Sequence, residues 1–315
     1  MLEKSLCRTG SAAGRKFPAR LIRSKMPRAL PPLMRKTVSF FYVISFNRVI
    51  LCIVWRYSTK QDSFYRTPGK VRMGRVIRAF VQGWDVEVGG LLTLDGDEGN
   101  HLARVLRAEP GMEVELLDGK GSHFDAVCRE VSKSGAVVEV RAVNQKNRPV
   151  PEFFMGIAWG KGRTLDELVR PLTELGVGGI TPLLTERTEA RFDPEKWHLR
   201  KKKWQKIAQE ACKQSGHSWL PDFSDPVHIK DYFASAELKE PHWMGSLCRG
   251  HSPLVPGGQH RTCHLLIGPE GGWTHKEEEM AGQVGCQFFS LGVTTLRMET
   301  AAVSALAVAR SHLLC

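Results

Sequence analysis

The sequence predicts an α/β protein in which a small β-barrel precedes a parallel sheet flanked by helices. Three observations lead to this fold class. Short apolar runs separated by turns follow one another between residues 78 and 143, strand and helix patterns alternate from residue 153 onward, and two glycine-bearing loops near the end each lie between an apolar run and a helix. Short, closely spaced strands are typical of a barrel, and strand–helix alternation is typical of a parallel sheet.

The first 73 residues differ in charge from the rest of the chain. They hold 16 Lys and Arg against two acids, a net charge of +14, whereas the remaining residues sum to −2. Their apolar stretch at residues 40–55 is too short and too polar for a membrane span. We expect residues 1–73 to be a disordered basic extension. It is either a transit segment for a mitochondrion or plastid, or an over-long reading frame with Met73 as the start of a cytoplasmic protein.

Residues 74–147 are predicted to form the barrel. Strands are expected at residues 78–81, 91–94, 112–117, 124–131 and 136–143. One helix is expected at residues 98–108, with Leu102, Val105 and Leu106 on the apolar face and with Arg104 and Arg107 pointing the other way. These arginines fit either a solvated helix face or a ridge that contacts phosphates.

A polar, proline-bearing linker at residues 144–151 leads to the second domain, residues 152–315. Strands are expected at residues 153–159, 180–184, 264–267 and 288–291, and helices at 164–176, 195–215 and 299–314, with a loop-rich stretch at 246–261. In the long helix, Trp197 and Trp204 flank a basic run. Tryptophans beside lysines suit stacking on bases, and tryptophans seven residues apart also suit a core stripe.

The two glycine-bearing loops are the predicted ligand site, because a strand that ends in glycine before a capped helix builds a crevice at the strand ends. The residues expected to lie against a flat ligand are Ile267, Gly268, Pro269, Gly271, Gly272, Leu291, Gly292 and Leu296. The charged residues of the same loops are Glu270, Arg297 and Glu299. An acid such as Glu299 at a helix start also interacts favourably with the helix dipole.

No metal centre is predicted, because the sequence has no Cys-x-x-Cys, no His-Glu-x-x-His and no paired Cys/His spacing. The eight cysteines are widely scattered, which favours unpaired thiols in a reducing compartment. The sequence also lacks the phosphate-binding loop and the Gly-x-Ser-x-Gly elbow.

The glycine loops resemble the signature of the RsmE family. Residues 267–272 read Ile-Gly-Pro-Glu-Gly-Gly, residues 291–292 read Leu-Gly, and residues 296–301 read Leu-Arg-Met-Glu-Thr-Ala. Residues 100–107 are similar to the family's RNA-binding barrel, and the blocks 173–177, 182–187 and 204–216 are similar to its middle region. The family's members are ribosomal RNA small-subunit methyltransferases that modify N3 of a uridine with S-adenosylmethionine as donor.

The resemblance implies a PUA-like β-barrel joined to a SPOUT-type parallel-sheet domain with a trefoil knot. It also implies a homodimer that acts on small-subunit ribosomal RNA, away from membranes and without a metal. The donor is expected against the two glycine loops, Arg297 beside the anionic uracil or its phosphate, and Glu270 or Glu299 as proton acceptor. RNA contacts are expected from His101, Arg104, Arg107, Arg187 and Gln214.

Four positions depart from the family pattern. Pro171 stands inside a predicted helix, which it should kink or shorten. His217 replaces an arginine, Thr294 lies where the family commonly has Pro-Arg, and Met298 replaces a threonine. Two alternatives therefore stay open: a non-catalytic RNA-binding or ribosome-assembly protein of the same fold, and a transfer-RNA methyltransferase of the same superfamily.

Overall fold

The computed structural model describes residues 39–46, 49–56, 76–81, 87–132, 135–160, 162–188, 192–235, 240–249, 252–256 and 260–312. The chain divides into two units, Met1–Pro68 and Gly69–Cys315. In the first unit, β1 (Ser39–Phe46) and β2 (Val49–Arg56) form an antiparallel pair. The rest of the predicted basic extension, with Met73, lies outside the described residues. Among the described helices, none combines the length and apolar character that crossing a bilayer requires.

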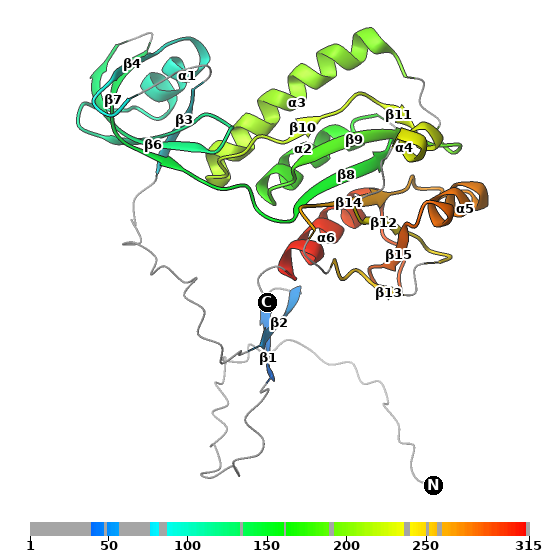
Figure 1. Ribbon diagram of the computed structural model, residues 1–315. Helices are drawn as coiled ribbons and strands as arrows, with labels where there is room; N and C mark the ends of the chain where they lie inside the picture. The colour runs from blue at the N-terminus through cyan, green and yellow to red at the C-terminus, as the bar shows by residue number, and fades with distance from the viewer. Residues whose placement is uncertain are drawn as a thin grey trace, which may run out of the picture. The chain divides into compact units, whose positions relative to one another are not determined.

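The first sheet of the second unit is the predicted half-barrel. Its strands are β3 (Ile77–Phe80), β4 (Leu91–Leu94), β5 (Glu113–Leu117), β6 (Ser122–Val131) and β7 (Ala136–Gln145). They lie in the order β3-β5-β6-β7-β4 (Figure 1), with β3 and β5 parallel and the other pairs antiparallel. Side chains alternate between the faces of a strand. Val114 and Leu116 of β5 therefore enter the barrel core, and Glu113 and Glu115 do not.

The helix predicted at residues 98–108 is shorter than expected and changes type. It consists of α1 (Gly96–Asn100) and a π-helical turn, η2 (His101–Val105), whose buried Leu102 packs in the barrel core. The N–H of Ala108 returns to the Leu102 carbonyl oxygen at 3.0 Å. This closure puts Arg107 in the left-handed region, at φ 50°. The prediction that Arg104 and Arg107 share one helix face is therefore wrong, because the helix ends between them.

The second sheet is wholly parallel and has the order β10-β9-β8-β14-β12-β15-β13, with β11 also paired to β9 (Figure 1). Its longer strands are β8 (Glu152–Ala158), β9 (Gly179–Leu184), β12 (His242–Gly245), β14 (Thr262–Ile267) and β15 (Gln287–Ser290). Its short edge strands are β10 (Asp222–Phe223), β11 (Val227–His228) and β13 (Ser252–Pro253). The predicted parallel-sheet fold class is confirmed.

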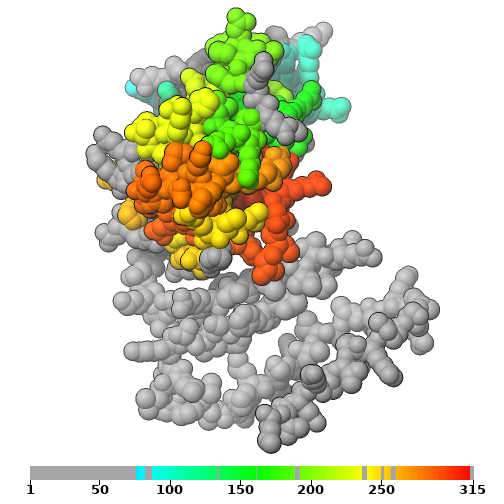
Figure 2. All heavy atoms as spheres, turned by 90° about the vertical axis from the view of Figure 1, so that its right-hand side faces the viewer, coloured from blue at the N-terminus to red at the C-terminus, as the bar shows by residue number. Residues whose placement is uncertain are grey.

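Helices cover both faces of this sheet. The residues of β14 that face one side, such as Leu265 and Ile267, pack with α2 (Thr164–Glu174), α3 (Pro194–Ser215) and α6 (Met298–Ser311). On the other side, Leu266 packs in a cluster with residues of α4 (Ile229–Ser235) and α5 (His275–Gln283). Figure 2 shows the face formed by α4 in yellow and α5 in orange. Both faces of the strands are covered, as in other parallel sheets.

Of the two interpretations of the tryptophans in α3, the core stripe is correct. Trp197 is 5% exposed and Trp204 is fully buried, and the two rings meet edge to face at 5.1 Å. The Trp204 indole donates to Asp166 Oδ1 at 2.6 Å. Burial alone would raise the pKa of Asp166, but hydrogen bonds from Lys203, Trp204 and Arg200 hold it below its ordinary value. Arg200 and Lys203 of the basic run thus balance a partly buried carboxylate.

The proline in α2 does not end the helix. Although Pro171 lacks an N–H, α2 continues through it to Glu174. The Pro171 carbonyl oxygen still accepts the Leu175 N–H at 3.0 Å, and the Thr173 hydroxyl donates to the Val169 carbonyl oxygen at 2.7 Å. The helix then stops where the sequence indicates, because Gly176 takes φ 75°.

Candidate active site

A cavity of about 190 Å³ opens where β12, β14 and β15 end at their carboxyl sides. Three loops that leave these strands surround it: residues 245–248, 268–273 and 291–296. The start of α6 closes it with Met298 and Ala301. A crevice outside the carboxyl ends of parallel strands is the usual place for a ligand in such a sheet.

The loop at residues 268–273 owes its shape to tight local packing. The Gly272 N–H closes a turn onto the Pro269 carbonyl oxygen at 2.8 Å, and Gly272 takes φ 70°, which favours glycine. The Trp273 ring packs so close that a Cβ on Gly268 would lie 2.9 Å from it. The Trp273 indole then donates to the Gly245 carbonyl oxygen at 2.8 Å, which ties this loop to the end of β12.

Arg187, predicted to contact RNA, is exposed and lies in the cavity wall. Its Nη1 donates to the Gly271 carbonyl oxygen and lies 3.2 Å from the Trp273 carbonyl oxygen. The guanidinium therefore neutralises carbonyl dipoles that would otherwise point outward from the loop. Its place in this structure is that of a support for the glycine loop.

A buried carboxylate beneath this wall joins the same two loops. Glu277, fully buried, accepts the Glu186 N–H on Oε1 at 2.9 Å and the Thr274 N–H on Oε2 at 2.8 Å. The Thr274 hydroxyl accepts the Glu277 N–H at 3.3 Å, which completes the predicted capping box. Glu277, which completes the capping box of α5, thus also fixes the loop after β9.

A second buried acid lines the cavity from α5. Glu278 is 5% exposed, and its Oε1 accepts the Ser246 hydroxyl at 2.5 Å. Ser246 Oγ in turn accepts the backbone N–H groups of Cys248 and Arg249 at 3.1 and 2.9 Å. The other oxygen, Oε2, lies 3.6 Å from Arg249 Nε, so this carboxylate at the cavity is partly balanced by an arginine, while most of the remaining wall is apolar or backbone.

The second predicted loop contributes only part of its residues to the cavity. Leu291 and Leu296 line it, together with Thr294 and Thr295. Gly292 does not line it; its φ of 137° and its contact with the Ser290 hydroxyl serve the turn after β15.

The three predicted catalytic residues do not all meet at the cavity. Glu270 is exposed and lines it. Arg297, the N-cap residue of α6, is exposed and lies outside the lining, and Glu299, in the first turn of α6, is half-buried and also outside it. Of the two alternative proton acceptors, Glu270 is therefore the one that lines the cavity of its own chain.

The predicted RNA-contacting residues come from three separate parts of the fold. His101 and Arg104 lie in the π-helical turn of the half-barrel, with Arg107 just beyond it. Gln214 lies in the last turn of α3, where its carbonyl oxygen accepts Arg78 Nη1 at 3.2 Å. Arg187 lines the cavity at the carboxyl ends of the parallel strands.

His217 is the departure whose setting is best explained. Burial, with the positive charges of Arg310 and Lys146, lowers the pKa of His217 to about 4. The residue is therefore neutral at physiological pH. A Cβ on Gly176 would lie 2.8 Å from the Arg310 guanidinium and 3.2 Å from the His217 ring, so the three residues pack tightly against one another.

Several lining residues were missed by sequence reasoning. They belong to the segment interpreted as loop-rich and to the buried face of α5, namely Gly245, Ser246, Leu247, Cys248 and Glu278. The signal for them is weak, because β12 is only four residues long. The five cysteines whose side chains the structure describes are free. Burial raises the pKa of Cys263 to about 11 and that of Cys286 to about 12.

Fold and cavity together define a two-domain RNA methyltransferase, and comparison with known proteins agrees. The chain matches the family described as "RNA methyltransferase domain" over residues 146–310 and the one described as "RNA methyltransferase PUA domain" over residues 94–141. Ribosomal RNA small subunit methyltransferase E of Synechocystis is 34% identical over 224 residues, which cover 69% of this chain and 71% of that protein. The Aquifex aeolicus protein of the same name is 29% identical, covering 70% and 94%.

Two solved structures are similar over most of the second unit. A Legionella pneumophila methyltransferase in complex with the bound cofactor SAM is 31% identical, with a TM-score of 0.67, covering 76% of this chain and 98% of that one. Ribosomal RNA small subunit methyltransferase E of Neisseria gonorrhoeae, bound to S-adenosyl methionine, is 26% identical, with a TM-score of 0.66, covering 74% and 95%. The chain belongs to the RsmE family of RNA methyltransferases.

Proposed function

We propose that this protein transfers a methyl group from S-adenosylmethionine to N3 of a uridine in small-subunit ribosomal RNA. The observation that carries the proposal is the cavity at the carboxyl ends of β12, β14 and β15, built largely from backbone and apolar side chains. Two relatives of the same fold hold S-adenosylmethionine.

The residues at the cavity suit this donor. The backbone at Gly245 packs closely against the Phe289 side chain, since a Cβ on Gly245 would lie 3.2 Å from the Phe289 ring. Ile267, Leu291 and Leu296 give apolar surface for a flat adenine. The carboxylate of Glu278 adds the negative charge that a cationic donor needs.

The reaction sets two tasks for the protein. When bound, S-adenosylmethionine supplies an activated methyl group on a sulfonium. Holding the methyl group in line with N3 of the uracil ring lowers the activation free energy by ~7–11 kcal/mol. The rigid loops at residues 245–248 and 268–273 provide this alignment. Uridine N3 carries a proton, so a base or a cation must assist. Glu270, exposed at the cavity, accepts this proton, and Arg297 stabilises the anionic ring or its phosphate.

The position of N3 constrains the substrate. Because N3 lies on the Watson–Crick edge, the target uridine must be unpaired or flipped out of its helix. The exposed Arg104 and Arg107 of the half-barrel then contact phosphates of the same RNA, and His101 and Gln214 extend this contact. Such a substrate places the enzyme where small subunits assemble: the cytoplasm, or an organelle if residues 1–73 act as a transit segment.

We further propose that the active unit is a homodimer with a trefoil-knotted methyltransferase domain. Arg297 and Glu299 do not line the cavity of their own chain although their neighbours Leu296 and Met298 do, and a dimer in which a second chain brings them to the substrate accounts for this position. Leu247 at the cavity and Val293 in the adjoining loop are 68% and 105% exposed. Exposed apolar side chains next to a site suit a subunit interface. Sedimentation analysis tests this point, and a strictly monomeric active enzyme would contradict it.

Methylation of defined RNA tests the proposed function. Small-subunit RNA from a strain lacking this enzyme is incubated with the protein and labelled donor, digested, and its nucleosides are separated by mass. We expect N3-methyluridine at one position. Donor binding without methyl transfer would favour the RNA-binding alternative, and methylation of transfer RNA alone would favour the other.

A further inference from the structure

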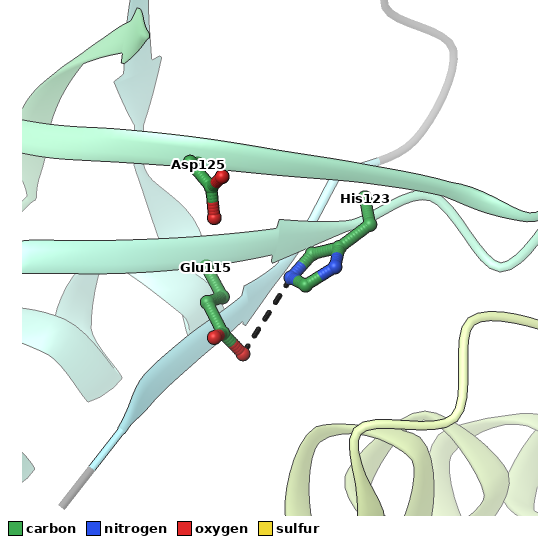
Figure 3. A group of neighbouring side chains, drawn as sticks. All are labelled: Glu115, His123 and Asp125. Atoms are coloured by element: carbon green, nitrogen blue, oxygen red, sulfur yellow. Dashed lines mark ion pairs between the residues drawn. The ribbon is translucent and has the colours of Figure 1, made fainter. Parts of the chain in front are cut away.

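The outer face of the half-barrel carries a cluster of three side chains that the methyltransferase reaction does not use. Glu115 of β5 and Asp125 of β6 lie directly opposite each other in the antiparallel pair. His123 lies two residues before Asp125 on the same face. One ligand atom of each residue lies within 4.8 Å of the other two. Figure 3 shows the three side chains, with Glu115 and His123 joined as an ion pair.

The charges of this cluster are not balanced among its own members. Two carboxylates directly opposite each other on one face of a sheet repel. Arg78 donates from Nε to Glu115 Oε2 at 2.7 Å and so offsets only one of them. The Asn144 amide, at 3.4 Å from Asp125 Oδ2, adds a weak neutral contact.

The imidazole of His123 gives a second, independent indication. Its Nε2 is buried and has no hydrogen-bond partner among the described residues, although it lies 3.5 Å from Glu115 Oε2. Nε2 thus faces a carboxylate oxygen without a hydrogen bond of ordinary length, and buried polar atoms are normally satisfied. A cation between the imidazole and the two carboxylates removes both problems.

We propose that Glu115, His123 and Asp125 bind a divalent transition-metal ion on the outer face of the half-barrel. One imidazole and two carboxylates suit ions such as Zn²⁺, Co²⁺ and Mn²⁺. Metal–ligand bonds are about 2.0–2.2 Å, so the side chains need to close by about an ångström, which rotation can supply. Asp125 is exposed, so solvent can fill the remaining coordination positions.

Arg78 supports this site from outside. Its Nη1 donates to the Lys213 carbonyl oxygen at 3.0 Å while its Nε holds Glu115. Hydrogen bonds to a ligating carboxylate orient it for the metal. The site does not depend on the proposed methyl transfer, because none of its residues lines the donor cavity.

Cobalt is the most informative probe, because its visible spectrum separates nitrogen and oxygen ligands from thiolates. The full chain, stripped of metal with a chelator, is titrated with Co²⁺ at neutral pH. We expect saturable absorbance for one ion per chain without a thiolate band. His123→Gln and Asp125→Asn should each weaken binding at least tenfold. Glu130→Gln, an exposed residue of the same strand, is the matched control and should bind as the parent does.

A measurement on the unchanged protein covers the case in which a variant does not fold. Substoichiometric Mn²⁺ should broaden the amide resonances of residues 122–126 before others, because relaxation by the ion falls steeply with distance. Absence of saturable Co²⁺ binding, or equal binding by His123→Gln, would overturn the proposal.

Discussion

The carboxylate of Glu277 accepts the backbone N–H of Glu186 at 2.9 Å, across 91 positions of sequence. The same carboxylate accepts the N–H of Thr274. One buried acid therefore joins the loop after β9 to the loop after β14. Arg187 of the first loop also donates to carbonyl oxygens of the second. The two loops of the cavity wall are therefore joined by both a buried carboxylate and a guanidinium.

Replacement of Glu277 by Gln should destabilise the protein and weaken donor binding. The amide keeps one acceptor and turns an NH₂ toward a backbone N–H, and an unsatisfied buried donor costs about 1–3 kcal/mol. Urea unfolding and calorimetry with S-adenosylmethionine measure both effects. Glu279→Gln, an exposed residue of the same helix, is the control. Unchanged unfolding in Glu277→Gln would show that the two loops are held together by other contacts.

Gly271→Val should reduce donor affinity at least tenfold while the fold is kept. A Cβ at Gly271 would lie 3.3 Å from Arg187 Cδ, and the branches of valine would enter the same wall. Calorimetry with S-adenosylmethionine, beside far-ultraviolet spectra, checks this. Gly282→Ala is the control, since its Cβ would find its nearest neighbour at 3.7 Å. Near-normal affinity in Gly271→Val would place the donor elsewhere.

The protein should lose stability as pH falls from about 6.5 to 4. Burial, with the charge of His242, lowers the pKa of His264 to about 4, and His217 has a similar value. Between these pKa values and the unfolded value near 6.5, the unfolded state binds more protons. The free energy of unfolding is therefore highest above pH 6.5. As the pH decreases, it falls by up to roughly 1.4 kcal/mol per pH unit for each histidine.

The acid effect can be assigned with a single substitution. His264→Gln should make the difference in unfolding free energy between pH 7 and pH 5 smaller, whatever its effect at pH 7. Gln287→Ala, at an exposed position of β15 with no titratable side chain, should leave that difference unchanged. If both variants keep the parent's pH dependence, His264 is not the group that takes up the proton.

Arg104→Glu combined with Arg107→Glu should weaken RNA binding and flatten its salt dependence, because fewer counterions are released when phosphate contacts are lost. Donor affinity should stay the same. The control is Lys230→Glu with Lys276→Glu, which makes the same change in net charge at exposed positions of the methyltransferase domain. An equal slope of affinity against salt in the parent and the Arg104/Arg107 variant would mean that these arginines belong to a solvated surface.

A chain that begins at Met73 should keep a cooperative thermal transition and bind the donor. The two sheets and their cores lie within the unit Gly69–Cys315. Differential scanning calorimetry of the shortened and full chains makes the comparison. Aggregation of the shortened chain, or a broad transition, would show that the boundary is misplaced.

Local patterns predicted much of the fold. The strands of the half-barrel, the long helix, the stop at Gly176 and the capping box at Thr274 follow from periodicity and capping chemistry, which act over a few residues. The short edge strands and α4 were missed, because two to seven residues carry too little periodicity. The early end of the helix at Val105 was missed because Arg107 adopts a conformation that sequence seldom assigns to arginine.

The parts of the candidate site that the backbone of the glycine loops forms were predicted. The parts that side chains from distant segments form were missed. The glycine loops are contiguous in sequence, so their part of the cavity could be found from residues alone. The Glu277–Glu186 contact and the Glu115–His123–Asp125 cluster each join different elements. A search for metal motifs could not find the cluster, because its spacing becomes visible only when β5 pairs with β6.

The central strand pairing sets the order in which the chain can fold. Met155 of β8 pairs with Leu265 of β14, a strand that follows more than a hundred residues later. Pairing over such a separation requires a large loop to close first and is slow. During synthesis, β8 and β9 therefore emerge with one edge of β8 unsatisfied until β14 leaves the ribosome. We expect the half-barrel, whose strands are neighbours in sequence, to form early, and the donor cavity to be among the last features to appear.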